Sequence, residues 1–200
     1  MKENQILYRY EFKYILNKKT SDQIEKEARN FMIYDGHVKK ELNNKYFVRS
    51  LYFENNFSSN FYEKADGMKI RRKYRLRTYS NIFDPKVPIF FEVKGRISER
   101  TYKKRINIKN KYLNLFLSQS QNFNLLDLYP NNEMIINFIF DSFRKNLKPL
   151  ILVDYKRRPY INKFGLYFRL TFDTNLLSSK TNNLFSNDKY SSWLECKAGY

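Results

Sequence analysis

The chain contains the stretch Lys69-Ile70-Arg71-Arg72-Lys73-Tyr74-Arg75-Leu76-Arg77-Thr78-Tyr79, which predicts a strand with two chemically different faces. Successive side chains of a strand point to opposite sides, so every basic residue of the stretch except Arg72 falls on one face. Mostly apolar residues fall on the other face, and we expect Arg72 to lie in solvent or at a rim. Positive charges two residues apart repel one another unless an anion lies among them. The stretch therefore predicts a bound anion.

The whole chain is strongly basic and has enough apolar residues to build a core. Its 200 residues include 38 Lys and Arg against 20 Asp and Glu, which gives a formal net charge of +18, and 42% are hydrophobic. This composition predicts a single folded domain over residues 1–200. The charge predicts a polyanionic partner: a nucleic acid, an anionic membrane surface or a phosphate-rich small molecule. Composition does not choose among the three.

Cysteine content and hydropathy bear on the compartment. Cys196 is the single cysteine, so an intramolecular disulfide is excluded, and a reducing compartment fits. The first residues lack the apolar run of a signal peptide, and no stretch approaches the roughly 18 apolar residues that span a bilayer. We expect a soluble cytoplasmic protein that reaches the inner face of a membrane only through partners.

Residue patterns predict eight strands and three helices. Alternating or aromatic-rich segments indicate strands over 8–15, 46–54, 69–79, 89–96, 101–108, 150–158, 166–173 and 191–198. Apolar residues at helical spacing indicate helices over about 20–34, 112–117 and 131–147. The strands are nearly consecutive and many are joined by short turns, which favours one mainly antiparallel sheet in an α+β, mainly β fold.

The charged registers of these strands allow two arrangements. In the first, an open sheet leaves its charged face in solvent; in the second, about eight strands close into a barrel with a wet cationic interior and helices packed outside. Fourteen cations but only four acids share the registers, and unpaired buried charges cost several kcal/mol, so we expect the closed barrel to hold a polyphosphate group. The cations are Arg9, Lys13, Lys69, Arg71, Lys73, Arg75, Arg77, Lys94, Arg96, Lys103, Arg105, Arg157, Arg169 and Lys197.

The in-register acids are Glu11, Glu92, Asp173 and Glu195. A carboxylate among so many cations either forms an ion pair or coordinates a divalent metal that bridges phosphates. Glu11 and Glu92 precede lysines by two residues in the same register, so the ion-pair and metal interpretations stay open for both. Glu195 is the better candidate for a metal ligand.

Seven ordered motifs resemble those of VTC-domain polyphosphate polymerases, which belong to the triphosphate tunnel metalloenzymes together with the CYTH proteins. The motifs are Arg9-Tyr10-Glu11-Phe12-Lys13-Tyr14, Ser50-Leu51-Tyr52-Phe53-Glu54-Asn55, Tyr74-Arg75-Leu76-Arg77-Thr78-Tyr79, Phe91-Glu92-Val93-Lys94, Tyr155-Lys156-Arg157, Arg169-Leu170-Thr171-Phe172-Asp173-Thr174 and Leu194-Glu195-Cys196-Lys197. They run from residue 9 to 197. The resemblance therefore covers essentially the whole chain.

The resemblance implies an eight-stranded antiparallel tunnel and an enzyme that synthesises polyphosphate from ATP. The terminal phosphate of ATP passes to a growing chain, ADP leaves, and a divalent metal, Mn²⁺ or Mg²⁺, assists. By resemblance the catalytic phosphate-binding residues are Lys13, Arg75, Arg77, Lys94, Arg157 and Arg169. Further substrate-binding residues are Arg9, Arg71, Lys73, Lys103, Arg105 and Lys197. The implied metal ligands are Glu195 and, less directly, Glu11.

Two departures from the wider tunnel group leave alternatives open. Arg9 replaces the first acid of a Glu-x-Glu-x-Lys motif, which favours the VTC branch over triphosphate hydrolases and cyclases. The chain ends at Tyr200, where VTC domains usually continue into a helix that plugs the tunnel. The alternatives are a non-catalytic polyphosphate- or nucleotide-binding module and a triphosphate hydrolase of the same superfamily. Nucleic-acid binding is the lesser candidate.

Overall fold

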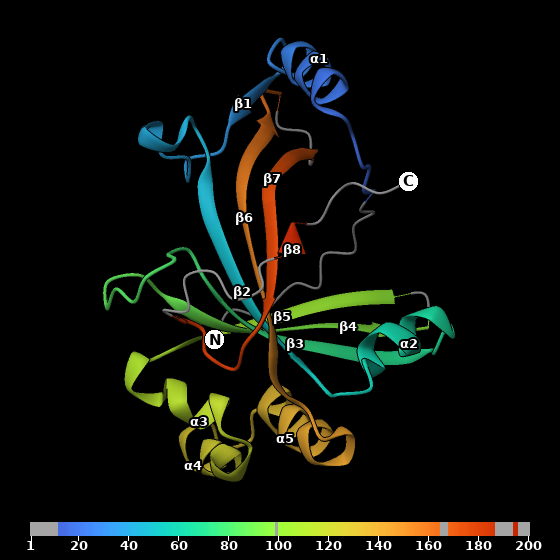
Figure 1. Cartoon of the computed structure of the whole chain (residues 1–200), viewed down its shortest axis with the longest axis vertical. Coiled ribbons are helices and arrows are strands. Elements are labelled where there is room, and N and C mark those ends of the chain that lie inside the picture. The colour runs from blue at the N-terminus through green and yellow to red at the C-terminus, as the bar shows by residue number, and fades with distance from the viewer. Residues whose placement is uncertain (1–11, 99, 165–167, 187–193, 196–200) are drawn as a thin grey trace.

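The computed structural model describes residues 12–98, 100–164, 168–186 and 194–195, and within them the fold is one antiparallel sheet with helices (Figure 1). The strands are β1 Met32–Tyr34, β2 Tyr46–Glu54, β3 Ile70–Thr78, β4 Ile89–Ile97, β5 Arg100–Ile108, β6 Lys148–Asn162, β7 Arg169–Lys180 and β8 Leu194–Glu195. The helices are α1 Lys18–Ala28, α2 Ser59–Ala65, α3 Leu113–Leu117, α4 Leu125–Leu128 and α5 Glu133–Lys145, with 3-10 turns at Lys40–Leu42, Asn110–Tyr112 and Gln119–Asn124.

The sheet is curled and, among the described residues, open. Its order is β5-β4-β3-β2-β6-β7-β8, with β1 beside β6, and every pair is antiparallel. Figure 1 shows β6 and β7 running along the long axis while β3, β4 and β5 run across it, as a strongly twisted sheet requires. The prediction of a mainly β antiparallel fold is confirmed. The predicted closed barrel is not seen: the structure describes a half-barrel whose edge strands, β5 and β8, do not pair.

One face of the sheet holds the main core. Helices α3, α4 and α5 gather against β3, β4 and β5 at one end of the molecule (Figure 1). The core rings are packed edge to face: Phe138 of α5 lies 4.9 Å from Phe53, 5.2 Å from Tyr74 and 4.7 Å from Phe91, measured between ring centroids. All four side chains are fully buried. The apolar faces of β2, β3 and β4, which carry Phe53, Tyr74 and Phe91, therefore point toward these helices.

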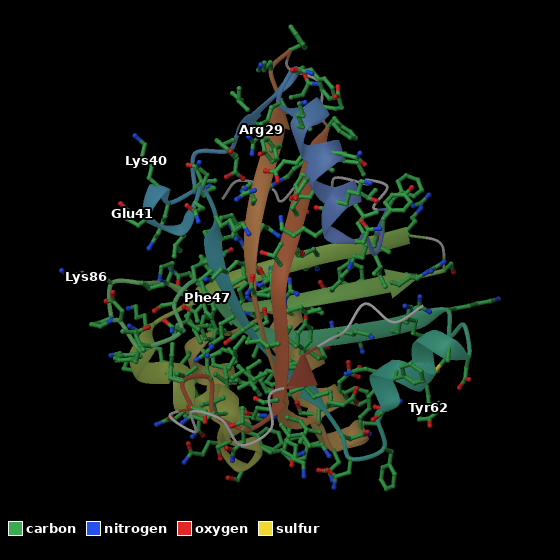
Figure 2. All side chains as sticks on the ribbon, turned by 45° about the horizontal axis from the view of Figure 1, so that its top comes forward. Arg29, Lys40, Glu41, Phe47, Tyr62 and Lys86 are labelled. Carbon is green, nitrogen blue, oxygen red and sulfur yellow. The ribbon has the colours of Figure 1, made fainter. Side chains whose placement is uncertain are left out.

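A smaller core lies at the other end, between α1 and the distal halves of β6 and β7. Ala28, Met32, Tyr160 and Phe172 are buried there. Glu25 of α1 accepts hydrogen bonds from the Tyr160 hydroxyl and the Arg158 guanidinium. Arg29, labelled in Figure 2, also donates to the Tyr160 hydroxyl, at 3.4 Å. These contacts fix α1 on the same face as the other core, because Arg158 and Tyr160 share the register of Leu152.

Several predicted elements have different bounds in the structure. The helix expected over 20–34 ends at Ala28, and Met32–Tyr34 pairs with β6 instead, where the Tyr34 and Tyr160 rings lie 4.9 Å apart. Residues 12–15 of the strand predicted over 8–15 have no regular structure, while 8–11 lie outside the described residues. The strand predicted over 166–173 continues as β7 to Lys180, because β7 stays paired with β6 as far as Ile151.

Arg72, for which the sequence predicts a place in solvent or at a rim, is partly buried, with 22% of its side chain exposed. It points to the helical side and makes a two-bond contact with Asp141 of α5, at 2.7 and 3.2 Å, and the Tyr74 hydroxyl donates to the same carboxylate at 2.8 Å. Asp141 is 1% exposed, so its charge needs these partners. Arg72, the basic residue of β3 that departs from the charged register, therefore forms a structural ion pair with Asp141.

Gly95 of β4 leaves room for a ring on the neighbouring strand. Gly95 pairs with Tyr102 of β5, and a Cβ added to Gly95 would lie 2.1 Å from the Tyr102 ring. We expect Gly95→Ala to lower the free energy of unfolding by about 1–3 kcal/mol, because the ring must move. Urea unfolding measures this. Gly36→Ala is the control, since nothing lies within 4 Å of its added Cβ, and an equal loss in both variants would contradict the packing argument.

None of the helices among the described residues is long and apolar enough to cross a bilayer.

Candidate phosphate-binding site

The sheet face opposite the helical core, which we call the cationic face, carries the odd-numbered basic residues of β3. Directly paired residues of antiparallel strands point to the same side. Arg75 pairs with Tyr52 of β2 and Glu92 of β4, and Glu92 pairs in turn with Arg105 of β5. Lys73, Lys94 and Lys103 form the next row, and Arg71 and Arg96 the row after that. With Arg77, which shares the register of Arg75, the strands β3, β4 and β5 thus bring eight cations onto one surface.

Glu92 lies at the centre of the cationic face and is held by three cations. Its carboxylate is 2.6 Å from Arg75 Nη2, 2.9 Å from Lys103 Nζ and 3.9 Å from Arg77 Nη1, and the side chain is 1% exposed. Burial alone would raise the pKa of Glu92, but the neighbouring positive charges outweigh burial and hold the pKa below its usual range. A single carboxylate is therefore shared by three cations. The cluster keeps a net positive charge.

The sequence offered Lys94 as the ion-pair partner of Glu92, two residues away. In the structure, Glu92 pairs instead with residues of the neighbouring strands, Arg75, Arg77 and Lys103. This follows from the pairing of β3, β4 and β5, which places Arg75 and Arg105 directly beside Glu92. Glu92 is thus an ion-paired residue on the cationic face.

Hydroxyl groups orient the two central arginines. Arg75 Nη1 donates to the Tyr52 hydroxyl at 2.8 Å, and Arg77 Nε donates to Ser50 Oγ at 3.0 Å. Arg77 Nη2 also donates to the Tyr155 hydroxyl at 3.3 Å. Sequence reasoning did not assign a role to these hydroxyls, although Ser50 and Tyr52 share one register of β2. The hydroxyls hold the guanidinium groups without cancelling their charge.

The pKa of Tyr52 records the positive potential of the site. Burial raises this pKa, but the charges of Arg75 and Arg77 outweigh burial, so the pKa falls below its usual value. The charge of Lys13 lowers the pKa of Tyr52 as well. A site that favours a phenolate favours other anions too.

Two members of the lysine row have lowered pKa values. Burial lowers the pKa of Lys73, and the charges of Lys64 and Arg71 lower it further, although Glu54 and Tyr52 oppose them. Burial likewise lowers the pKa of Lys103, despite its contact with Glu92. A bound anion would relieve this repulsion. The row is therefore suited to a chain of phosphate groups, whose oxygens accept from ammonium groups.

The two predicted arginines of β6 and β7 lie on the same face but each has an acidic partner. Arg157 donates to both oxygens of Asp173, at 2.7 Å each. Burial would lower the pKa of Arg157, but Asp173 outweighs burial and raises it. Arg169 pairs with Asp35, which sequence reasoning had not included. These two cations are therefore partly neutralised, in contrast to the cluster around Glu92.

Four predicted site residues cannot be placed by their side chains. Arg9, Glu11 and Lys197 lie outside the described residues, and Glu195 is described only by its backbone pairing with Leu177. Among the described residues, no group of three His, Cys, Asp or Glu could hold a metal ion.

Comparisons with known proteins bear on this arrangement. The family model of the VTC domain matches residues 8–198. Among solved structures, the chain is similar to a protein from Bacillus halodurans described as a "putative adenylate cyclase", with a TM-score of 0.50 and 14% sequence identity over 82% of this chain and 69% of that one. At this identity the likeness shows the fold alone. Comparison with curated proteins gives no match.

Proposed function

Since this chain belongs to the VTC domain family, we propose that it makes polyphosphate by transferring the terminal phosphate of ATP to a growing chain. One observation carries the proposal. The cationic face joins a net-positive cluster around Glu92 to the row of Lys73, Lys94 and Lys103. This surface offers charge-assisted hydrogen bonds to many phosphate oxygens in succession.

The residues of the cationic face act by position and charge. A terminal oxygen of the acceptor chain attacks the terminal phosphorus of ATP, the bond to the bridging oxygen breaks, and ADP leaves with that electron pair. Arg75 and Arg77 neutralise the charge on the transferred group, while the lysine row holds the acceptor in line. No side chain needs to form a covalent bond. Arg157 and Arg169 would add phosphate contacts beside them.

A divalent metal, Mn²⁺ or Mg²⁺, is part of the proposal, with Glu195 and Glu11 as its ligands. When bound it would neutralise phosphate charge. We also propose that 1–200 form one domain whose sheet closes into a tunnel, with Arg9, Lys13 and Lys197 contributing cations. The location proposed for the activity is the cytoplasm, near a membrane partner.

A direct assay tests the proposed reaction. The protein is incubated with ATP and Mn²⁺ or Mg²⁺, and ADP and long-chain polyphosphate are measured together. Equal amounts of ADP and of phosphate in the chain are expected. Release of free phosphate without chain growth would instead indicate a triphosphate hydrolase. Tight polyphosphate binding with no turnover under either metal would indicate a binding module.

Two neighbouring lysines of β5 give a matched test of which face binds phosphate. Lys103 lies on the cationic face and Lys104 on the helical face, and their side chains are 42% and 40% exposed. We expect Lys103→Gln to weaken tripolyphosphate binding about tenfold, because one charge-assisted contact is lost. Lys104→Gln removes the same charge and should change binding less than twofold. Calorimetric titration at fixed salt measures both, and equal losses would show that net charge alone attracts the ligand.

A further inference from the structure

One end of the cationic face carries aromatic rings in place of lysines. Tyr46 of β2, Tyr79 at the end of β3 and Phe90 of β4 form this group, which we call the aromatic cluster. The Tyr46 and Tyr79 ring centroids are 5.8 Å apart at 71°, and those of Tyr79 and Phe90 are 6.2 Å apart at 72°. All three rings are only half-buried, unlike the fully buried rings of the main core. Their contacts with one another leave ring surface accessible.

The aromatic cluster lies directly beside predicted phosphate-binding arginines. Phe90 pairs with Arg77, and Tyr46 pairs with Arg157. The guanidinium carbon of Arg105 lies 4.7 Å from the centre of the Phe90 ring. Flat guanidinium groups and aromatic rings are the two surfaces on which nucleobases stack. The cluster thus has the chemistry of a base-binding surface at the edge of a phosphate-binding one.

The spacing of the basic residues along β3 indicates which way a nucleotide would lie on this surface. Arg77 and Arg71 are six residues apart, which corresponds to roughly 20 Å along a strand. A nucleotide whose base lies on the aromatic cluster would extend its phosphates past Arg77 toward Arg75. Its terminal phosphate would then face the lysine row that holds the acceptor. The opposite orientation would place the base among lysines and arginines, with fewer rings to stack on.

We propose that Tyr46, Tyr79 and Phe90 form a nucleobase-stacking site that orients ATP with its terminal phosphate toward the lysine row. The inference rests on the proposed function, since it places the donor of that reaction. Stacking depends on ring area and less on ring substituents, so purine nucleotides bind more tightly than pyrimidine nucleotides. ADP leaves from the aromatic end while the polyphosphate chain stays on the lysine row.

Affinities of Tyr79 variants for two ligands test the proposal. Tyr79→Leu is expected to weaken ATP binding about tenfold and to change tripolyphosphate binding less than twofold, because tripolyphosphate has no base. Tyr79→Phe keeps the ring and should keep the ATP affinity. In the synthesis assay, Tyr79→Leu should raise KM for ATP with little change in kcat. The reason is that stacking holds the base equally well in the ground state and in the transition state.

Phe47 supplies the matched control for the ring. It is also half-buried, it is adjacent to Tyr46 on β2 but in the opposite register, and Figure 2 labels it. Phe47→Leu should leave the affinity for ATP unchanged, whereas Tyr46→Leu should reduce it. Equal weakening of ATP and tripolyphosphate by Tyr79→Leu, or no weakening of ATP, would overturn the stacking site.

The outcomes separate this inference from the proposed function. If the wild-type protein makes polyphosphate and Tyr79→Leu keeps its ATP affinity, the stacking site is wrong and the polymerase proposal stands. If ATP binding depends on Tyr79 but no polyphosphate forms, the stacking site stands and the polymerase proposal falls.

Discussion

Arg77→Gln is expected to lower the rate of polyphosphate synthesis by at least about 100-fold, which is the usual loss when one donor to a developing negative charge is removed. Arg77 is 7% exposed and is held by Ser50, Tyr155 and Glu92. In the proposed reaction, Arg77 would therefore contact the transferred phosphoryl group with little loss of conformational freedom. The effect should fall mainly on kcat, because the charge that Arg77 neutralises is greatest in the transition state.

Two variants control the Arg77 experiment. Arg77→Lys keeps the charge but loses the planar fork, so we expect an intermediate loss of rate. Arg144→Gln removes a positive charge from α5, where the arginine side chain is 56% exposed, and should leave the rate nearly unchanged. Thermal unfolding should show that Arg77→Gln remains folded. A folded Arg77→Gln protein with more than half the wild-type rate would contradict the assignment.

The charged face was predictable from the sequence because it depends on alternation alone. Residues two apart on β3 share a face whatever the strand's neighbours are. Which side chains meet across strands depends on register, and local patterns do not determine register. For this reason the alternation correctly placed Arg75 and Arg77 on one surface, yet gave Glu92 the wrong partner.

Partners that are distant in the sequence account for other differences. Arg72 lies 69 residues from Asp141, so nothing near it in the sequence reveals that its charge is satisfied by a helix. Arg169 and Asp35 are 134 residues apart and meet only because β1 and β7 both pair with β6. The apolar residues near Met32 suit either a helix or a strand. Pairing with β6 then decides in favour of a strand.

Glu92→Gln is expected to lower the free energy of unfolding by on the order of 3 kcal/mol at pH 7, because Arg75, Arg77 and Lys103 lose the carboxylate that they share. Tripolyphosphate should restore more stability to this variant than to the wild-type protein, since the anion then supplies the missing negative charge. Urea unfolding with and without tripolyphosphate measures both effects. Glu133→Gln is the control, because Glu133 pairs with Lys104 on the helical side and is 74% exposed.

The stability difference between wild type and Glu92→Gln should depend on pH in one direction. The pKa of Glu92 is lower in the folded protein than the value of about 4.3 expected when it is unfolded. The carboxylate therefore contributes its full stability above that unfolded pKa and loses the contribution as the pH falls through the folded pKa. Subtracting the Glu92→Gln curve removes the effect of other carboxylates. We expect a constant difference from pH 8 to about 5 and a smaller difference in more acidic solution; a difference that grows on acidification would show that Glu92 is not held as an anion by the cationic face.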